Sequence, residues 1–304
     1  MTRRSWTGLA AGLGASAIWG AMFVVSKAVL PVVPPLTLLT FRLVLGALTL
    51  GATAVWGTLT RRTPRPKTSW NTWLAVLGAG FVGYGVSLGF QFAGTALGTA
   101  SNAALVTCAT PAFVAVFAAP LLKERLGARA WTALALATAG VLAVLAPELA
   151  SFDSANAANL LLVAAALTWA LYTVLTARAA RGTDLVLSSL VGFLGGLPVS
   201  VPGMLLELSA HPLGTIDGGI VAGILFLGLV STALAMLLWN YAFQSLPASA
   251  AGLTFFAQPV TGTLLATLFL GEAPGALFYV GAALIAAALF VGQNAQREDS
   301  PQRR

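Results

Sequence analysis

Two basic side chains fall inside apolar runs long enough to cross a bilayer, where a charge is costly and marks a functional site by default. Arg42 lies seven residues after Pro35, which is about 10 Å along a helix. A guanidinium binds a carboxylate through two parallel hydrogen bonds, so Arg42 is a candidate for holding a substrate carboxylate. The alternative is a structural arginine that binds backbone carbonyls or extends to the interface, as Lys27 near Pro31 can also do.

Amide, phenol and indole groups in the apolar runs form a second set of candidates. Such groups orient a small polar ligand without the desolvation cost of a full charge. Interhelical hydrogen bonds and aromatic rings at the membrane interface are the structural alternatives. Together with Arg42, the candidate substrate-binding residues are Trp19, Tyr84, Gln91, Asn102, Trp169, Tyr172, Asn240, Tyr241 and Gln258.

One short motif could support nucleophilic catalysis. The segment GVSLG (85–89) matches the Gly-x-Ser-x-Gly pattern, which raises the alternative of a Ser87–His211 pair in a membrane hydrolase. The pattern lacks its strand–turn–helix context, and 32 glycines make a chance match common. The sequence has no nucleotide-binding Gly-x4-Gly-Lys-Ser/Thr motif and no Asp or Glu in the middle of an apolar run. We therefore expect no catalytic residue, no metal site and no cofactor.

The composition requires that membrane-spanning helices position these residues. Only 8% of the residues are Asp, Glu, Lys or Arg and 58% are hydrophobic, whereas roughly 25% are charged in an ordinary globular protein. A soluble protein cannot cover its surface with so few charges, but lipid can solvate an apolar surface. The single cysteine, Cys108, excludes a disulfide scaffold. The sequence is therefore typical of an all-α integral membrane protein.

Ten apolar segments are long enough to cross about 30 Å of hydrocarbon as helices. The connections between them are too short to hold a soluble domain. The first segment follows Arg3 and Arg4 and exceeds the length of a signal-peptide core, so we expect it to be retained as the first helix. The predicted transmembrane helices are 7–29, 35–57, 70–93, 97–119, 130–146, 156–177, 185–206, 217–242, 248–270 and 274–292.

The distribution of Lys and Arg predicts the orientation. With the N-terminus in the cytoplasm, 14 of the 16 basic residues lie in cytoplasmic segments, and the other two are Lys27 and Arg42. The net charge of +7 then reflects topology and contact with anionic membrane lipids, and we expect no nucleic-acid binding. We predict a multi-pass protein of the cell (inner or plasma) membrane, with both termini cytoplasmic.

The two halves of the sequence resemble each other. A Pro-x12-Glu-x2-Gly pattern starts in the fourth segment and recurs 148 residues later, from the ninth segment. Five helices per half force the second half into the opposite orientation, and such inverted repeats place a substrate site at their interface. The predicted organisation is a first repeat over 1–150, a second repeat over 151–295 and a cytoplasmic tail over 296–304.

The proline and glutamate of this pattern are interpreted as structural. Each glutamate precedes another segment, where a carboxylate can bind the free amides at the start of a helix. Ion coupling through the glutamates is the alternative. The residues of this structural motif are Pro111, Glu124, Pro259 and Glu272.

The sequence resembles the drug/metabolite transporter superfamily, specifically its ten-helix EamA-type carriers. The resemblance rests on WGAMFVVSKA (19–28), FRLVLGALTL (41–50) and the repeated proline–glutamate pattern, in the family's order over nearly the whole chain. It implies transport of small metabolites, often amino acids, through a cavity lined by helices 1, 3, 4, 6, 8 and 9. Two features depart from the family: the second glutamate lies in GEAPG (271–275), and Arg42 has no counterpart in the seventh segment.

Transport by alternating access, most naturally export, is the function that these patterns favour. Small metabolites such as amino acids are the expected substrates, membrane lipids the expected surroundings and a monomer the expected state. A membrane sensor or scaffold without substrate flux is the alternative, and a serine hydrolase using Ser87 is a more remote one.

Overall fold

The regular structure of the protein is helical throughout the part of the chain that its computed structural model describes. Eight helical segments are long and apolar enough to cross a membrane. Two shorter apolar helices, Thr254–Leu270 and Ala276–Val291, lie where the ninth and tenth spans are predicted. The predicted order of spans is thereby confirmed. The structure describes residues 3–60, 68–122, 127–146, 154–179, 183–246 and 254–298.

The first half contributes five spans, and polar side chains start two of their helices. Ser69 accepts a hydrogen bond from the backbone N–H of Thr72, and Thr99 accepts one from Asn102, as N-cap residues do. The third span is longer than predicted and contains a π-helical stretch. The elements are α1 (Arg3–Val29), α2 (Pro35–Thr60), α3 (Trp70–Gly80), η1 (Phe81–Ser87), α4 (Leu88–Leu97), α5 (Ala100–Thr107), α6 (Thr110–Leu122) and α7 (Ala128–Leu145).

The second half repeats this plan in the opposite orientation. Asp184 and Asp217 cap two of its helices through their carboxylates. Gly271, at φ 67°, ends another helix in the left-handed conformation that glycine adopts without strain. The elements are α8 (Ser154–Ala179), α9 (Leu185–Ala210), α10 (Gly218–Leu225), η2 (Phe226–Leu234), α11 (Ala235–Ser245), η3 (Thr254–Phe256), α13 (Ala257–Leu270) and α14 (Ala276–Glu298).

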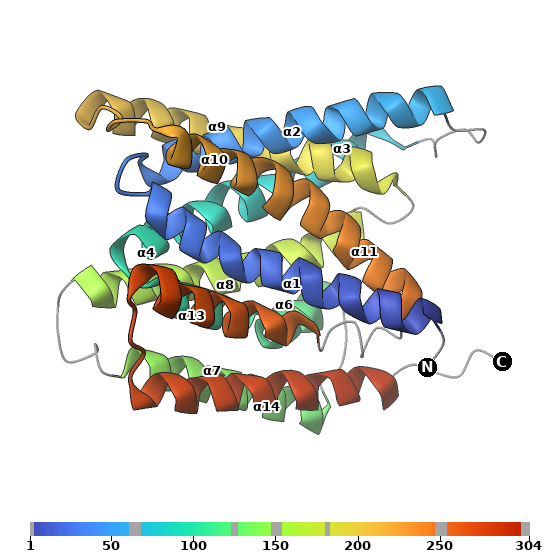
Figure 1. Cartoon of the computed structure of the whole chain (residues 1–304). Helices are drawn as coiled ribbons and strands as arrows, with labels where there is room; N and C mark the ends of the chain where they lie inside the picture. Colours follow the sequence, from blue (N-terminus) through green and yellow to red (C-terminus); the bar gives the residue numbers. More distant parts are fainter. Residues whose placement is uncertain are drawn as a thin grey trace.

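Figure 1 shows the spans side by side, with α7 against α14 at one flank and α2 against α9 at the other. Between these pairs lie two groups of three spans. The first triplet consists of spans 1, 8 and 9, in which α1 packs on α11 and α13. The second triplet consists of spans 3, 4 and 6, in which α8 packs on α4 and α6. We use "outer end" for the end away from residues 3 and 298, where α1 turns into α2 and α13 into α14.

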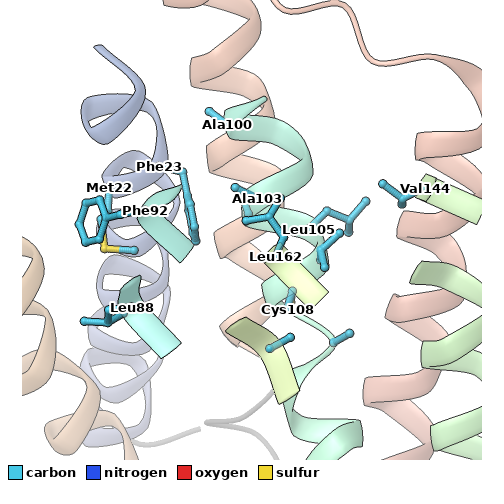
Figure 2. Close-up of a cluster of buried hydrophobic side chains, with 14 of the residues drawn as sticks. Met22, Phe23, Leu88, Phe92, Ala100, Ala103, Leu105, Cys108, Val144 and Leu162 are labelled. Atoms are coloured by element: carbon cyan, nitrogen blue, oxygen red, sulfur yellow. The ribbon is translucent and has the colours of Figure 1, made fainter. Parts of the chain in front are cut away.

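The two triplets pack on each other through their outer halves. α5 packs on α1 and α13, and α4 packs on α1. The inner half of the fourth span, α6, instead packs mainly on α8, with smaller contacts to α7 and α14. Met22 and Phe23 of α1 lie beside Leu88 and Phe92 of α4, and all four belong to the buried core (Figure 2). Within the described residues, the contact between the triplets therefore lies toward the outer end.

Both triplets contain a π-helical stretch near the middle of one span. η1 interrupts the third span and η2 the eighth. Shifted by the repeat offset of 148 residues, η1 covers 229–235, which overlaps η2. π-Helical turns are rare and occur most often at functional sites, because they redirect side chains out of the regular helical register. Their presence at related positions identifies this level of the protein as a candidate site.

Candidate functional site

An aromatic cluster surrounds Tyr84, which η1 presents to the rest of the second triplet. Its ring centroid lies 5.7 Å from that of Trp169 and 5.2 Å from that of Tyr172, both on α8. Phe193 of α9 lies edge-on at 4.4 Å. Trp169 and Tyr172 share one face of α8 because they are three residues apart. Gly83 permits the approach of Tyr172, since a Cβ at position 83 would lie 2.5 Å from Cδ2 of the Tyr172 ring and would clash with it.

The two tyrosines of this cluster place polar groups between the aromatic rings. The Tyr172 hydroxyl donates a hydrogen bond of 3.1 Å to the Tyr84 hydroxyl. Tyr84 is buried, with 5% of its surface exposed. A buried pair of linked hydroxyls still has a free proton and free lone pairs, so it can orient a polar group of a ligand. The predicted candidates Tyr84, Trp169 and Tyr172 are thus brought together.

Arg42 lies beside this cluster, buried to 9% exposure. Its Nε donates to the hydroxyl of Thr232, at 3.3 Å, and its Cζ lies 5.8 Å from the centre of the Phe92 ring. Its Nη1 is buried without a hydrogen-bond partner among the described residues. In the described structure the side chain neither extends to the interface nor binds a backbone carbonyl, and its hydrogen bond to Thr232 joins α2 to η2.

Trp19 forms a second aromatic group within the first triplet. Its ring lies 5.2 Å from Trp239 and 6.0 Å from Phe255, centre to centre. Its indole N–H donates to the backbone carbonyl of Ser231, at 3.0 Å. Ser231 directly precedes Thr232, the partner of Arg42. Trp19 and Arg42 therefore contact the same short stretch of η2 from two different helices.

Two predicted candidates form interhelical hydrogen bonds. The Gln258 side chain, on α13, donates to the carbonyl of Ala104 at 3.2 Å and to the hydroxyl of Thr107 at 3.3 Å. Asn102 of α5 donates to the Asn159 side chain on α8 at 3.4 Å. Gln258 thus joins the two triplets, whereas Asn102 acts within the second. These contacts match the structural alternative stated for such residues.

The remaining candidates lie apart from this centre or are less well defined. Gln91 is half-buried on α4, next to Phe92. Tyr241 is 42% exposed, and its hydroxyl lies 3.0 Å from that of Thr7 near the start of α1. The side chain of Asn240 lies outside the described residues. Tyr241 therefore does not join the group formed by Arg42 and the tyrosines.

Glu272 binds the start of α5 at the outer end. Its carboxylate accepts hydrogen bonds from the backbone N–H of Ala100 at 2.7 Å and of Ser101 at 2.9 Å. The Ser101 hydroxyl adds a third bond, at 2.6 Å. A glutamate at this position was expected to bind helix amides, but the helix is α5 of the second triplet and not α14, which follows it. Glu272 thereby joins the last connection of the chain to the second triplet.

Lys27 of α1 makes a neighbouring contact at the connection between α4 and α5. Its ammonium donates to the carbonyl of Ala96 in the last turn of α4, at 2.8 Å, and it lies near enough to Glu272 for electrostatic attraction. A cation at a helix C-terminus and an anion at a helix N-terminus both interact favourably with the helix dipole. We name the group of Lys27, Ala96, Ala100, Ser101 and Glu272 the outer clasp.

A second carboxylate, which is not among the residues predicted from the sequence, caps α2 in the same manner. Glu207 of α9 accepts from the N–H groups of Leu36 at 2.9 Å and Thr37 at 2.8 Å, and from the Thr37 hydroxyl at 2.9 Å. Pro35 has no N–H, so the first turn of α2 is fully satisfied. The first turn of α2 contains no acidic residue of its own. This absence is the sequence feature that could have indicated a capping carboxylate from another helix.

The prolines of the repeated pattern begin helices inside the membrane. Pro111 is the second residue of α6, just after a turn at Cys108–Ala109 that divides the fourth span. Pro259 is buried near the start of α13. Proline fits the first turn of a helix because its missing N–H has no helical partner there. Glu124 lies outside the described residues.

Comparison with known proteins gives a match over most of the chain. The model of the EamA-like transporter family matches residues 6–146 and 156–291. The chain is 23% identical to a protein of known crystal structure, with a TM-score of 0.64, over 96% of this chain and 99% of that one. At this identity the structural match supports the fold alone.

Three relatives match over most of their length. A protein of Escherichia coli strain K12 named "Probable amino-acid metabolite efflux pump" is 29% identical over 290 residues, covering 90% of both chains. The protein of the same name in Salmonella typhimurium strain LT2 is 30% identical over 293 residues, again covering 90% of both. An "Uncharacterized transporter" of Archaeoglobus fulgidus is 24% identical over 276 residues, covering 90% of this chain and 93% of that one.

Proposed function

Because the chain belongs to the EamA-like transporter family, we propose that it exports small metabolites, foremost amino acids and related compounds, by alternating access. The observation that carries this proposal is the packing of the two triplets. They are joined through α4 and α5 near the outer end, while Tyr84 lies farther from that end on the same span as α4, and Arg42 of α2 lies near Tyr84. Inverted-repeat carriers bind substrate where the repeats meet and open one end at a time. Relatives named as amino-acid metabolite efflux pumps support the substrate class.

The proposed substrate site uses residues from both repeats. Arg42, Tyr84 and Trp169 supply a cation, a hydroxyl and an aromatic face, and Tyr172 and Trp19 extend this surface. Aromatic walls with a few convergent polar groups are typical of small-molecule sites. Gln258 is assigned to closing the outer end and not to binding substrate, because its hydrogen bonds join one triplet to the other.

The sidedness follows from the positive charges of the sequence. With both termini in the cytoplasm, the outer clasp faces the outside and the conformation described here is closed on that side. Substrate would then enter from the cytoplasm between the inner halves of the triplets. Breaking the outer clasp would open the path for release.

Reconstituted transport tests this function. Purified protein in liposomes loaded with a panel of amino acids, nucleosides and sugars is expected to release at least one amino acid faster than protein-free liposomes. Trp169→Ala is expected to reduce that flux roughly 5- to 30-fold, since it removes an aromatic wall worth about 1–2 kcal/mol of binding. Trp131→Ala, at a tryptophan that is 59% exposed on α7, is the matched control and should leave the flux unchanged. No flux of any compound would favour the sensor or scaffold.

No enzymatic step is proposed, and Ser87 tests this. Its hydroxyl is buried, in the last residue of η1, and donates to the carbonyl of Ala165 at 2.7 Å. Ser87→Ala removes one hydrogen bond of about 1 kcal/mol, so transport should stay within a few-fold of wild type. The assay is the transport flux divided by the amount of folded protein. That amount is measured by size-exclusion chromatography. Abolished turnover with a normal elution profile would support the hydrolase alternative instead.

A further inference from the structure

Arg42 is a buried cation without a carboxylate partner in the described part of the chain. It has 9% exposure, and its Nη1 makes no hydrogen bond. A buried charge without a counter-ion is strongly unfavourable, so such a group is normally paired. The carboxylates of the described residues all lie at or near helix ends, two of them as N-caps and two bound to other helices. These carboxylates belong to Asp184, Glu207, Asp217 and Glu272, and the side chain of Glu298 lies outside the described residues.

The position of this cation is where the two repeats meet. Arg42, from the first repeat, bonds to Thr232 of η2 in the second repeat and lies near enough to Tyr84 of η1 to interact electrostatically. The guanidinium therefore lies between two related π-helical stretches. Its own counterpart is missing, since α9 contains no Lys or Arg.

The donors that remain on Arg42 define what can pair with it. Thr232 occupies Nε, which leaves the two Nη groups, and these match the two oxygens of a carboxylate. Lys27 is held in the outer clasp by Ala96, so Arg42 offers one positive charge to this site. One charge balances a carboxylate, but it is insufficient for a phosphate dianion. The adjacent rings of Phe92 and Tyr84 provide an apolar surface for the rest of the ligand.

We propose that Arg42 anchors the carboxylate of the transported compound, and that the substrates are small monocarboxylates with an apolar body. This inference rests on the proposed function and deepens it. The substrate carboxylate forms an ion pair with the buried guanidinium, so the charge of Arg42 is paired only when substrate is bound. Compounds without the negative charge lack this interaction. The protein thereby selects carboxylates over amides and esters of the same shape.

Binding to the purified full-length protein tests the inference apart from transport. Thermal unfolding is followed with L-leucine, L-phenylalanine and 4-methylpentanoate, with the primary amide of each, and with inorganic phosphate. At least one carboxylate is expected to raise Tm and to bind roughly 10- to 100-fold more tightly than its amide, as expected for a charged hydrogen-bonded pair. Phosphate should have no effect. Equal binding of the carboxylates and their amides, stronger binding of phosphate, or no stabilisation by any carboxylate overturns the inference.

Two variants locate the effect at Arg42. Arg42→Lys should lose most of the preference for carboxylate over amide, because an ammonium cannot form the planar two-bond contact. Thr232→Asp is the second variant, in case Arg42→Lys does not fold. It places an internal carboxylate beside Nε, so it should keep Tm and abolish the preference. Thr132→Asp, which adds the same charge at an exposed position near the start of α7, is the control and should retain the preference. An unchanged preference in Thr232→Asp contradicts the inference.

The two proposals fail in different ways. Flux without a preference for carboxylates contradicts the role of Arg42 and leaves the carrier in place. Selective carboxylate binding without flux contradicts the carrier, and keeps Arg42 as the binding residue of a sensor.

Discussion

Replacement of Gly80 by leucine is expected to prevent the third and seventh spans from packing, with loss of most of the folded protein. A Cβ at Gly80 would lie 2.6 Å from Cα and 2.7 Å from the carbonyl carbon of Gly192 on α9, and closer still to its oxygen. These are backbone atoms, so no side-chain rotation relieves the clash. Overpacking costs about 1–3 kcal/mol where side chains can shift, and a larger loss is expected here because one helix must move.

The matched control lies on the same helix. At Gly78, a Cβ would meet nothing within 4 Å, so Gly78→Leu adds a helix-favouring residue in open space. We expect Gly78→Leu to match or exceed wild-type thermal stability, and Gly80→Leu to give little monodisperse protein. The measurement is yield and Tm by fluorescence-detected size-exclusion chromatography. Equal yields of the two variants would show that the α3–α9 contact is dispensable.

This pair of glycines illustrates what the sequence could predict. The spans follow from the lengths of the apolar runs, which a bilayer of about 30 Å constrains strongly. Which glycines face a neighbouring helix does not follow, because Gly78 and Gly80 lie in the same apolar run and differ only in the direction that each faces. A membrane helix carries little amphipathic signal to fix that direction, since lipid and protein neighbours are both apolar.

The candidate site was predicted in part for the same reason. Arg42, Tyr84 and Tyr172 stand out because polar groups inside apolar runs are costly, and the structure brings them together. Thr232 and Phe193 do not stand out, because threonine and phenylalanine are ordinary residues of a membrane span. They are recognised only once η2 and α9 are placed around Arg42 and Tyr84.

The partners of Glu272 could not be predicted from local sequence either. A glutamate between two helices suggests a cap for the helix that follows, α14, because N-caps are usually local. Glu272 instead binds α5, more than 170 residues earlier, through Ala100 and Ser101. Thr99 satisfies the next amide, that of Asn102. The capping requirement of a buried helix start is general, but the residue that meets it is set by the tertiary fold.

Removal of the Glu272 carboxylate is therefore expected to open the outer end. Glu272→Ala leaves the amides of Ala100 and Ser101 without acceptors, and Lys27 without its nearby negative charge. Hydrogen bonds to a charged group contribute about 1.5–3 kcal/mol each. Because these bonds join the two triplets, their loss destabilises the outward-closed conformation more than an outward-open one. The population of the open state should rise by at least roughly 10- to 100-fold, which is the effect of losing one such bond.

A cysteine at Met22 measures that opening. Met22 is 5% exposed and lies against Phe92 between the triplets (Figure 2). With Cys108, the natural cysteine, replaced by alanine, a membrane-impermeant maleimide should label Met22→Cys slowly from outside. The added Glu272→Ala change is expected to accelerate labelling in proportion to the open population. Glu272→Gln, which keeps one acceptor oxygen, should give an intermediate rate.

Glu207→Ala separates opening of the outer end from general loosening. It removes a carboxylate with the same three hydrogen bonds, made to Leu36 and Thr37 at the start of α2. That contact lies within the α2–α9 pair and joins neither triplet to the other. Glu207→Ala should therefore lower Tm about as much as Glu272→Ala while Met22→Cys labelling stays slow. Equal acceleration by both variants would mean that the outer clasp stabilises the fold without controlling access, because only a contact between the triplets can favour one conformation over the other.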